Sequence, residues 1–174
     1  MHQVFSTMTD SSDPKYHSQE YIRHIASLKQ QLIDFSTSTT TEAIGSSLSS
    51  DILKLFKLAT LIYLERQSSS FSGVSEEIES WCNEAFQLLT ELKDFNQPFP
   101  LFILGCEART DEQRDVVLEL ISRTDLITHS KNLQYVAHIT KSVWVQDDLA
   151  DETIDYGRKL DRMLSSMRVC PSFA

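Results

Sequence analysis

The stretch PFPLFILGCEARTDEQR, residues 98–114, decides how the chain folds. Its two prolines cannot continue a helix from upstream, but proline is tolerated in a first turn, so Pro100 can open a short helix over 101–108. Thr110 followed by Gln113 is a capping-box pattern, which starts a new helix directly after the threonine. The stretch therefore predicts two helices that are separated by a sharp break.

The Gly-Cys-Glu triplet within this stretch fits either a packing contact or a reactive thiol. Gly105 has no Cβ and lets another helix approach closely. Cys106 lies among apolar residues, where burial raises the pKa of a thiol and makes it unreactive. A nucleophilic cysteine would need a histidine such as His129 or His138 nearby, and nothing local demands one. We favour the packing interpretation for both residues.

Two charges flank the predicted break. Glu107 lies in the last turn of the first helix, and Arg114 lies in the first turn of the second. An ion pair between them would fix the angle between the two short helices. The alternative, two independent surface charges, is equally consistent with the sequence.

Bulk composition limits the class of protein. A chain of 174 residues with 41% hydrophobic residues is long enough for one sizeable core and short for two, so we expect one domain. The formal net charge of −9 gives a surface that repels phosphates. Because nucleic-acid affinity rests largely on Lys and Arg, we expect no direct DNA binding by this chain.

The sequence offers no support for a metal, a cofactor or a membrane anchor. Cys82, Cys106 and Cys170 are odd in number and widely spaced, which is typical of buried reduced thiols. No histidine pair has metal-ligand spacing, and no dinucleotide, phosphate-binding or hydrolase motif is present. The chain lacks an apolar run of the about 20 residues that span a bilayer and lacks a signal peptide. We predict a soluble intracellular protein that is not an enzyme.

Apolar spacing and the scarcity of glycine and proline predict an all-α fold, a single irregular helical domain of about seven helices. Residues 1–17 are expected to be a disordered N-terminal segment and 18–174 the helical domain, with a Ser/Thr-rich loop at 36–50. Residues 58–64 are apolar on nearly every side, which predicts a central helix. The expected helices cover residues 18–35, 51–67, 75–93, 101–108, 111–123, 132–145 and 151–167.

Three segments together resemble a known family. PFPLFILGCEARTDEQR, LATLIYLERQ at 58–67 and SVWVQDDL at 142–149 are similar, in this order, to segments of the C-terminal regulatory domain of fungal-specific Zn(II)2Cys6 transcription factors, the fungal-specific transcription factor domain family. The resemblance implies an all-α fold without catalytic residues. It implies architectural roles for Tyr63, Arg66, Pro100, Leu101, Phe102, Gly105, Cys106, Glu107, Ala108, Arg114 and Trp144.

The chain departs from the family pattern because it shows no cysteine-rich DNA-binding module and no basic linker. The resemblance then implies a regulatory and protein-interaction domain of a zinc-cluster factor without its DNA-binding head: a truncated paralogue, a fragmentary gene model or a free regulatory domain. Its expected partners are the transcription machinery or a related factor, in the nucleus or the cytoplasm.

Two other functions stay open at this point. The first is a helical domain that responds to a small-molecule effector and regulates a specialised-metabolism pathway. The second, more remote, is a cysteine-dependent enzyme, which would require a histidine within hydrogen-bond reach of Cys106 or Cys82. Binding of a small molecule to the purified chain would separate the first from a domain that works through protein contacts alone.

Overall fold

A computed structural model describes residues 18–38, 47–69 and 75–149. The described residues form helices without strands, which confirms the all-α prediction. The predicted helix at 151–167 and the predicted disordered segment at 1–17 lie outside the described residues. The helices are α2 (Gln19–Ser38), α3 (Ser47–Ser69), α4 (Glu76–Glu91), α5 (Pro98–Glu107), α6 (Asp111–Thr128) and α7 (Lys131–Leu149).

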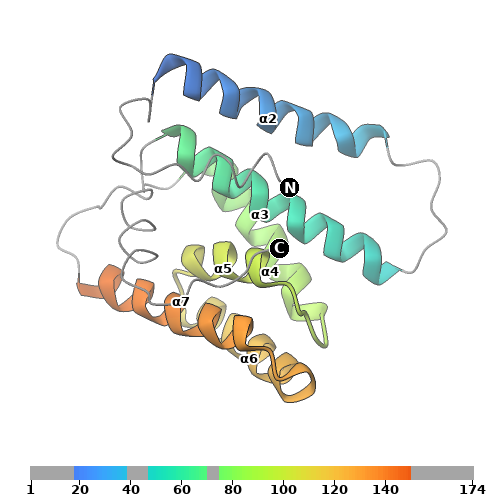
Figure 1. The fold of residues 1–174 in the computed structure, drawn as a ribbon, viewed down its shortest axis with the longest axis vertical. Coiled ribbons are helices and arrows are strands. Elements are labelled where there is room, and N and C mark those ends of the chain that lie inside the picture. The colour runs from blue at the N-terminus through green and yellow to red at the C-terminus, as the bar shows by residue number, and fades with distance from the viewer. Residues whose placement is uncertain (1–17, 39–46, 70–74, 150–174) are drawn as a thin grey trace.

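The helices pack around α3 and α5 (Figure 1). α2 lies along α3 as an outer layer, while α5 lies between α3 and the antiparallel pair α6 and α7. α4 contacts α3, α5 and α6. Buried apolar side chains from each of these helices join in one core, which holds the described parts of the chain together.

The centre of this core is built by two very different helices. In α3, residues 58–64 are all buried, so the predicted central helix is confirmed. In α5, every residue from Phe99 to Glu107 is buried, although the helix has only ten residues. Burial of a helix on all sides requires neighbours on all sides, and α5 contacts α3, α4, α6 and α7.

The predicted Ser/Thr-rich loop at 36–50 is too long. α2 continues to Ser38 and α3 already begins at Ser47, so both ends of the predicted loop are helical. Serine and threonine are only mildly unfavourable inside a helix, and a neighbouring helix can therefore extend into them. Residues 39–46 lie outside the described residues.

α5 also begins earlier than predicted. Gln97 is the N-cap, so Pro98 and Pro100 both lie in the first turn. The first backbone N–H groups of a helix have no intrahelical acceptor, and a proline there loses no hydrogen bond. The prediction that proline opens the helix is confirmed, with the start moved back to Pro98.

The break between α5 and α6 follows the predicted capping box. The Thr110 hydroxyl accepts a hydrogen bond from the Gln113 backbone N–H at 3.3 Å, and the Gln113 side chain accepts one from the Thr110 N–H at 3.4 Å. α6 then runs to Thr128 rather than 123. It ends at His129, whose backbone is left-handed (φ 49°, ψ 43°) and whose N–H donates to the Asp125 carbonyl at 2.8 Å.

Candidate functional site

The helix crossing at Gly105 places α7 directly against α5. A Cβ at position 105 would lie 2.6 Å from Thr140 Cγ2 and 3.0 Å from Thr140 Oγ1. The Thr140 hydroxyl donates to the Val136 carbonyl at 2.7 Å. One turn later, Trp144 Nε1 donates to the Gly105 carbonyl at 2.8 Å. Gly105 is therefore a close-approach residue, as its lack of a side chain predicts.

A buried ion pair joins α3 to the end of α5. Arg66 Nε donates to Glu107 Oε1 at 2.9 Å, and Arg66 Nη2 donates to Glu107 Oε2 at 2.7 Å. The two residues are 3% and 5% exposed. Bidentate geometry of this kind is the strongest arrangement of an arginine and a carboxylate, and burial makes it costly to remove either partner alone.

Glu107 and Arg114 form neither the ion pair nor the two independent surface charges that the sequence left open. Glu107 pairs with Arg66, whereas Arg114 Nη1 and Nη2 donate to the two carboxylate oxygens of Asp148 at 3.0 and 2.8 Å. The Arg114 guanidinium also lies 5.4 Å from the centre of the Trp144 ring. The α5–α6 break directs the two charges to different neighbours: Glu107 points to α3, and Arg114 points to the end of α7.

The other residues for which the family resemblance implies architectural roles are buried in the core. Tyr63 is buried and contacts Phe99 edge to face, with ring centroids 6.4 Å apart. Pro100, Leu101 and Phe102 are buried in the first turns of α5. Ala108 is the C-cap of α5, and its N–H donates to the Gly105 carbonyl at 3.2 Å.

The two cysteines in the described residues are buried thiols. Cys82 on α4 and Cys106 on α5 are each 8% exposed. Burial, followed by the negative charge of Glu107, raises the pKa of the Cys82 thiol to about 12. A thiol with so high a pKa stays protonated at neutral pH and is a poor nucleophile. Cys170 lies outside the described residues.

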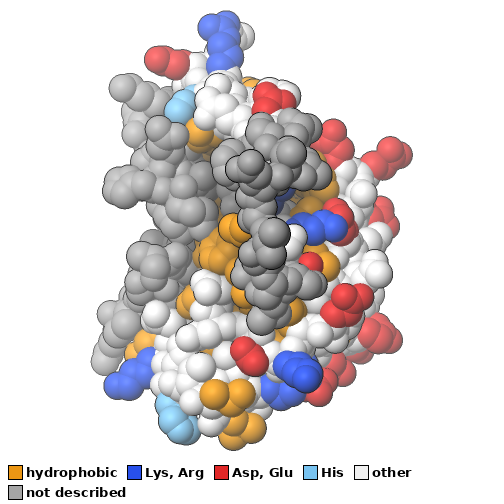
Figure 2. Space-filling model, turned by 90° about the vertical axis from the view of Figure 1, so that its right-hand side faces the viewer, with side chains coloured by type: hydrophobic (Ala, Val, Ile, Leu, Met, Phe, Trp, Pro, Cys, Tyr) orange, Lys and Arg blue, Asp and Glu red, His pale blue; other side chains and the backbone are white. Residues whose placement is uncertain are grey.

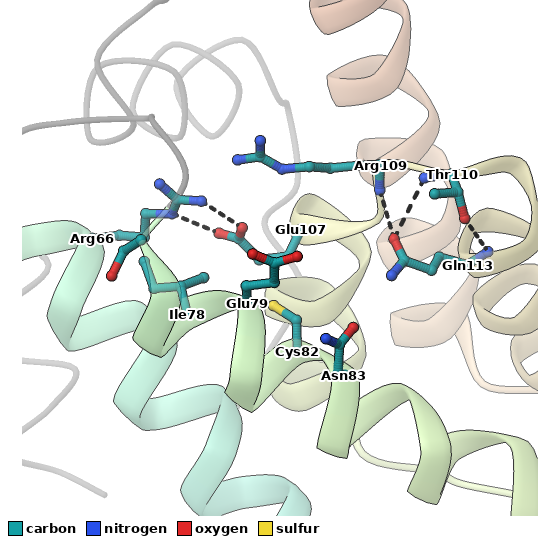
Figure 3. Close-up of a pocket in the computed structure, with 10 residues that line it drawn as sticks. Arg66, Ile78, Glu79, Cys82, Asn83, Glu107, Arg109, Thr110 and Gln113 are labelled. Carbon is teal, nitrogen blue, oxygen red and sulfur yellow. Dashed lines mark hydrogen bonds and ion pairs between the residues drawn. The ribbon is translucent and has the colours of Figure 1, made fainter.

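A pocket of about 280 Å³ opens beside the buried ion pair (Figure 3). α4 forms one wall, and the α5–α6 break forms the other. Cys82 and Ile78 supply apolar surface, while the rest of the lining is polar or charged. The lining residues are Arg66, Ser75, Ile78, Glu79, Cys82, Asn83, Glu107, Arg109, Thr110 and Gln113.

Among the residues of 18–38, 47–69 and 75–149, no cluster of three or more His, Cys, Asp or Glu side chains could hold a metal ion. None of the helices within those ranges combines the length and the apolar character needed to cross a membrane.

Comparison with known proteins identifies the family. The model of the fungal-specific transcription factor domain matches residues 2–170, nearly the whole chain. The chain belongs to the fungal-specific transcription factor domain family. This finding confirms the resemblance seen in the three sequence segments. No solved structure matches this transcription factor domain.

A curated relative of this transcription factor domain is also known. Transcription factor iacI of Pestalotiopsis fici (strain W106-1 / CGMCC3.15140) is 38% identical over 126 residues. The match covers 70% of this chain and 32% of that protein, so the domain spans about a third of its relative's length. The chain therefore belongs to a family of transcription factor domains and not to a family of enzymes.

The pocket of this transcription factor domain was not predicted from the sequence. Arg66 and Glu107 were named as architectural positions, but Glu79, Asn83 and Arg109 were not. One signal was available: each residue of the ion pair closes an apolar run, LIYLER and LFILGCE, and a charge at the end of a buried helix needs a partner. The partner itself, 41 residues away in the chain, could not be read from local pattern.

Proposed function

We propose that the chain is a regulatory domain that acts through contacts with other proteins, the transcription machinery or a related factor, and does not bind DNA itself. Its place of action is the nucleus. The observation that carries the proposal is the family match over residues 2–170, in a chain with a net charge of −9.

The charge distribution supports the second half of the proposal. Figure 2 shows Asp and Glu side chains gathered along one edge of the face drawn there, with Lys and Arg side chains scattered over it. A DNA-binding surface needs Lys and Arg clustered on one face so that they neutralise phosphates. An acidic surface instead favours contacts with basic protein segments and keeps the chain away from DNA.

The experiment has a binding part and a transcription part. Purified chain should give no shifted band with duplex DNA that survives competitor DNA at physiological salt. The same chain fused to an unrelated DNA-binding domain should change transcription of a reporter that carries the matching site. The unrelated DNA-binding domain alone, without the fused chain, serves as the control and should leave transcription at its basal level.

Two outcomes would contradict the proposal. Sequence-selective binding of the purified chain to DNA would show that it reads DNA directly. A folded fusion that leaves reporter transcription at the level of the DNA-binding domain alone would show that the domain makes no regulatory contact.

A further inference from the structure

The end of the molecule at which α6 passes into α7 exposes two large apolar side chains next to each other. Leu126 is 76% exposed and Ile127 is 71% exposed, both in the last turn of α6. Single exposed apolar residues are common on protein surfaces, but adjacent ones begin to form a patch, and patches mark places where a partner binds. Burial of both side chains against a partner is favourable because it removes apolar surface from water.

The charges around this patch are positive, although the chain as a whole is strongly acidic. Asp and Glu number 25 in the whole chain, yet none occurs in the range 126–146. Arg123 is exposed three and four positions before Leu126 and Ile127, so it lies on their side of α6. Lys131 is exposed in the first turn of α7. Figure 2 shows hydrophobic side chains at the lower end of the molecule, with Lys, Arg and His side chains on either side of them.

The acidic side chains near this patch do not cancel its positive charge. Asp125 Oδ2 accepts a hydrogen bond from Gln134 Nε2 at 2.9 Å and Asp125 Oδ1 is buried, so this carboxylate is directed to α7. Glu119 lies two turns back along α6. Asp94 lies beside Lys93 in the connection between α4 and α5, which is hydrogen-bonded to α6, and these two charges offset each other.

We propose that this surface, the apolar-basic end formed by Arg123, Leu126, Ile127 and Lys131, binds a segment of another protein in which Asp or Glu stand beside bulky apolar residues. The apolar side chains of the segment cover Leu126 and Ile127, and its carboxylates pair with Arg123 and Lys131. This binding role rests on the proposed regulatory function and adds to it the chemistry of the partner. The acidic edge of the molecule would repel the same segment, so the charges also orient it.

Other occupants fit the apolar-basic end less well. Two copies of the chain that paired symmetrically through it would bring Arg123 and Lys131 of both copies together, where like charges repel. A DNA-binding surface lines up many Lys and Arg along the phosphates and needs no large apolar side chains between them. A helix that binds a membrane surface is apolar along its length, whereas the exposed apolar pair of α6 is confined to its last turn.

Two synthetic peptides test the partner chemistry with the purified full chain. Both carry a fluorescent label and have Leu and Phe at helical spacing, but the Asp and Glu residues of one are replaced with Lys in the other. Fluorescence anisotropy should show that the acidic peptide binds at least about tenfold more tightly than the basic one, and that added salt weakens its binding.

Three results of this experiment would overturn the proposal. The first is equal binding of the two peptides, and the second is no binding of the acidic peptide. The third is binding of the chain to vesicles of anionic phospholipid but not to the acidic peptide, which would assign the surface to a membrane.

Variants locate the binding on the surface. Leu126→Ser/Ile127→Ser should weaken binding of the acidic peptide about tenfold or more, because both apolar contacts are lost. Leu53→Ser is the matched control, since Leu53 is 70% exposed on α3, and it should bind as the native chain does. Lys131→Glu should also weaken binding, whereas Arg23→Glu, the same change of charge at an exposed residue of α2, should not. All four variants alter exposed residues and should keep the native denaturation midpoint.

Native binding by either variant of the apolar-basic end would refute its role. A dimer of the native chain in sedimentation that the variant Leu126→Ser/Ile127→Ser converts to a monomer would instead assign the surface to a second copy.

The reporter fusion distinguishes failure of this binding site from failure of the regulatory function. The fused native chain should change transcription, and the fused variant Leu126→Ser/Ile127→Ser should lose most of that change while the fused Leu53→Ser variant keeps it. A folded native fusion without effect would contradict the regulatory function. An active native fusion whose effect is fully retained by Leu126→Ser/Ile127→Ser would contradict only the binding site.

Discussion

α5 and α2 both pack on α3, but different kinds of contact hold them. α5 is buried from Phe99 to Glu107 and is fixed by the Gly105–Thr140 crossing, the Trp144 hydrogen bond and the Arg66–Glu107 pair. α2 lies on the outside, where Ile25 and Leu28 are its buried apolar residues within the described side chains. α5 is therefore held by specific short-range contacts, and α2 is held by a stripe of apolar side chains.

This difference affects how the two helices tolerate change. A stripe of apolar side chains can adjust to a neighbour, whereas a backbone crossing and a bidentate ion pair allow one arrangement. Substitutions at the contacts of α5 should therefore cost much more stability than substitution of Lys29, the residue of α2 that forms ion pairs with Glu65 and Glu77. The four predictions that follow test this expectation, beginning with the largest effect.

Removal of one partner of the buried ion pair should have the largest effect. Arg66→Met or Glu107→Gln leaves a charged group buried without its partner, which costs about 3–5 kcal/mol of unfolding free energy. Chemical denaturation followed by circular dichroism gives this value.

The surface pair Lys54–Glu84, in which both side chains are nearly half exposed, provides the control. Lys54→Met should cost less than about 1 kcal/mol. The double variant Arg66→Met/Glu107→Leu should cost less than either single change, since no charge is left buried. Single variants at Arg66 and Glu107 that cost no more than Lys54→Met would show that α5 is not held by the ion pair.

Gly105→Leu should have the next largest effect. The new side chain must overlap Thr140, and overpacking of this kind costs about 1–3 kcal/mol. The denaturation midpoint of the variant measures the loss.

A smaller change at the same position separates sterics from helix preference. Gly105→Ala should destabilise the native chain, because its Cβ would lie 2.6 Å from Thr140 Cγ2. In a Thr140→Ala background the overlap is gone, and the same change should become neutral or stabilising by up to about 1 kcal/mol, since alanine favours a helix more than glycine does. An equal effect of Gly105→Ala in both backgrounds would contradict the close approach.

Cys106 should show the signature of a buried packing residue. Cys106→Ala should cost little, and Cys106→Ser should cost about 1 kcal/mol more, because a hydroxyl is more polar than a thiol and loses more hydration when it is buried. Denaturation midpoints of the two variants give the difference, and native protein should react slowly with a thiol reagent. Rapid native labelling of Cys106, with equal stability of both variants, would instead support a reactive thiol.

Lys29 should have the smallest effect, although it contacts two carboxylates and one aromatic ring. Its ammonium lies 2.7 Å from Glu65 Oε2, 2.8 Å from Glu77 Oε2 and 5.1 Å from the centre of the Trp81 ring. Both pairs are partly exposed, so Lys29→Met should cost less than about 1 kcal/mol, and less still at high salt. Ile25→Ala is the matched change on the buried side of α2, and it should cost more than Lys29→Met. The reverse order would mean that charge, not the apolar stripe, holds this helix.

The sequence predicted the local features of both helices. The sequence predicted the helix at 18–35, which is α2, and the capping box identified the start of α6. Ile22, Ile25, Leu28 and Ile33 recur at the three-and-four spacing of one helix face, and Ile25 and Leu28 are buried, yet Ile22 and Ile33 are 39% and 38% exposed. Because α2 packs mainly on one neighbour, only a narrow stripe of its surface is covered.

Contacts between distant segments could not be predicted in the same way. The need of Gly105 for a close neighbour was evident, but nothing in the sequence indicated that the neighbour is Thr140. A pair of Glu107 with Arg114, which is near in the chain, was one of two alternatives left open, whereas the partner of Glu107 is Arg66. The pocket has residues from α3, α4, α5 and α6 and the break before α6, and so it exists only once those parts have packed together.

The short length of α5 has a consequence for the order of folding. An isolated helix needs about 12–15 residues to be even marginally stable in water. α5 has ten, two of them prolines, and so it has no stability of its own. We therefore expect it to form only together with the packing of its neighbours α3, α6 and α7, late in folding. Substitutions at the α5–α7 crossing should therefore speed unfolding far more than they slow folding.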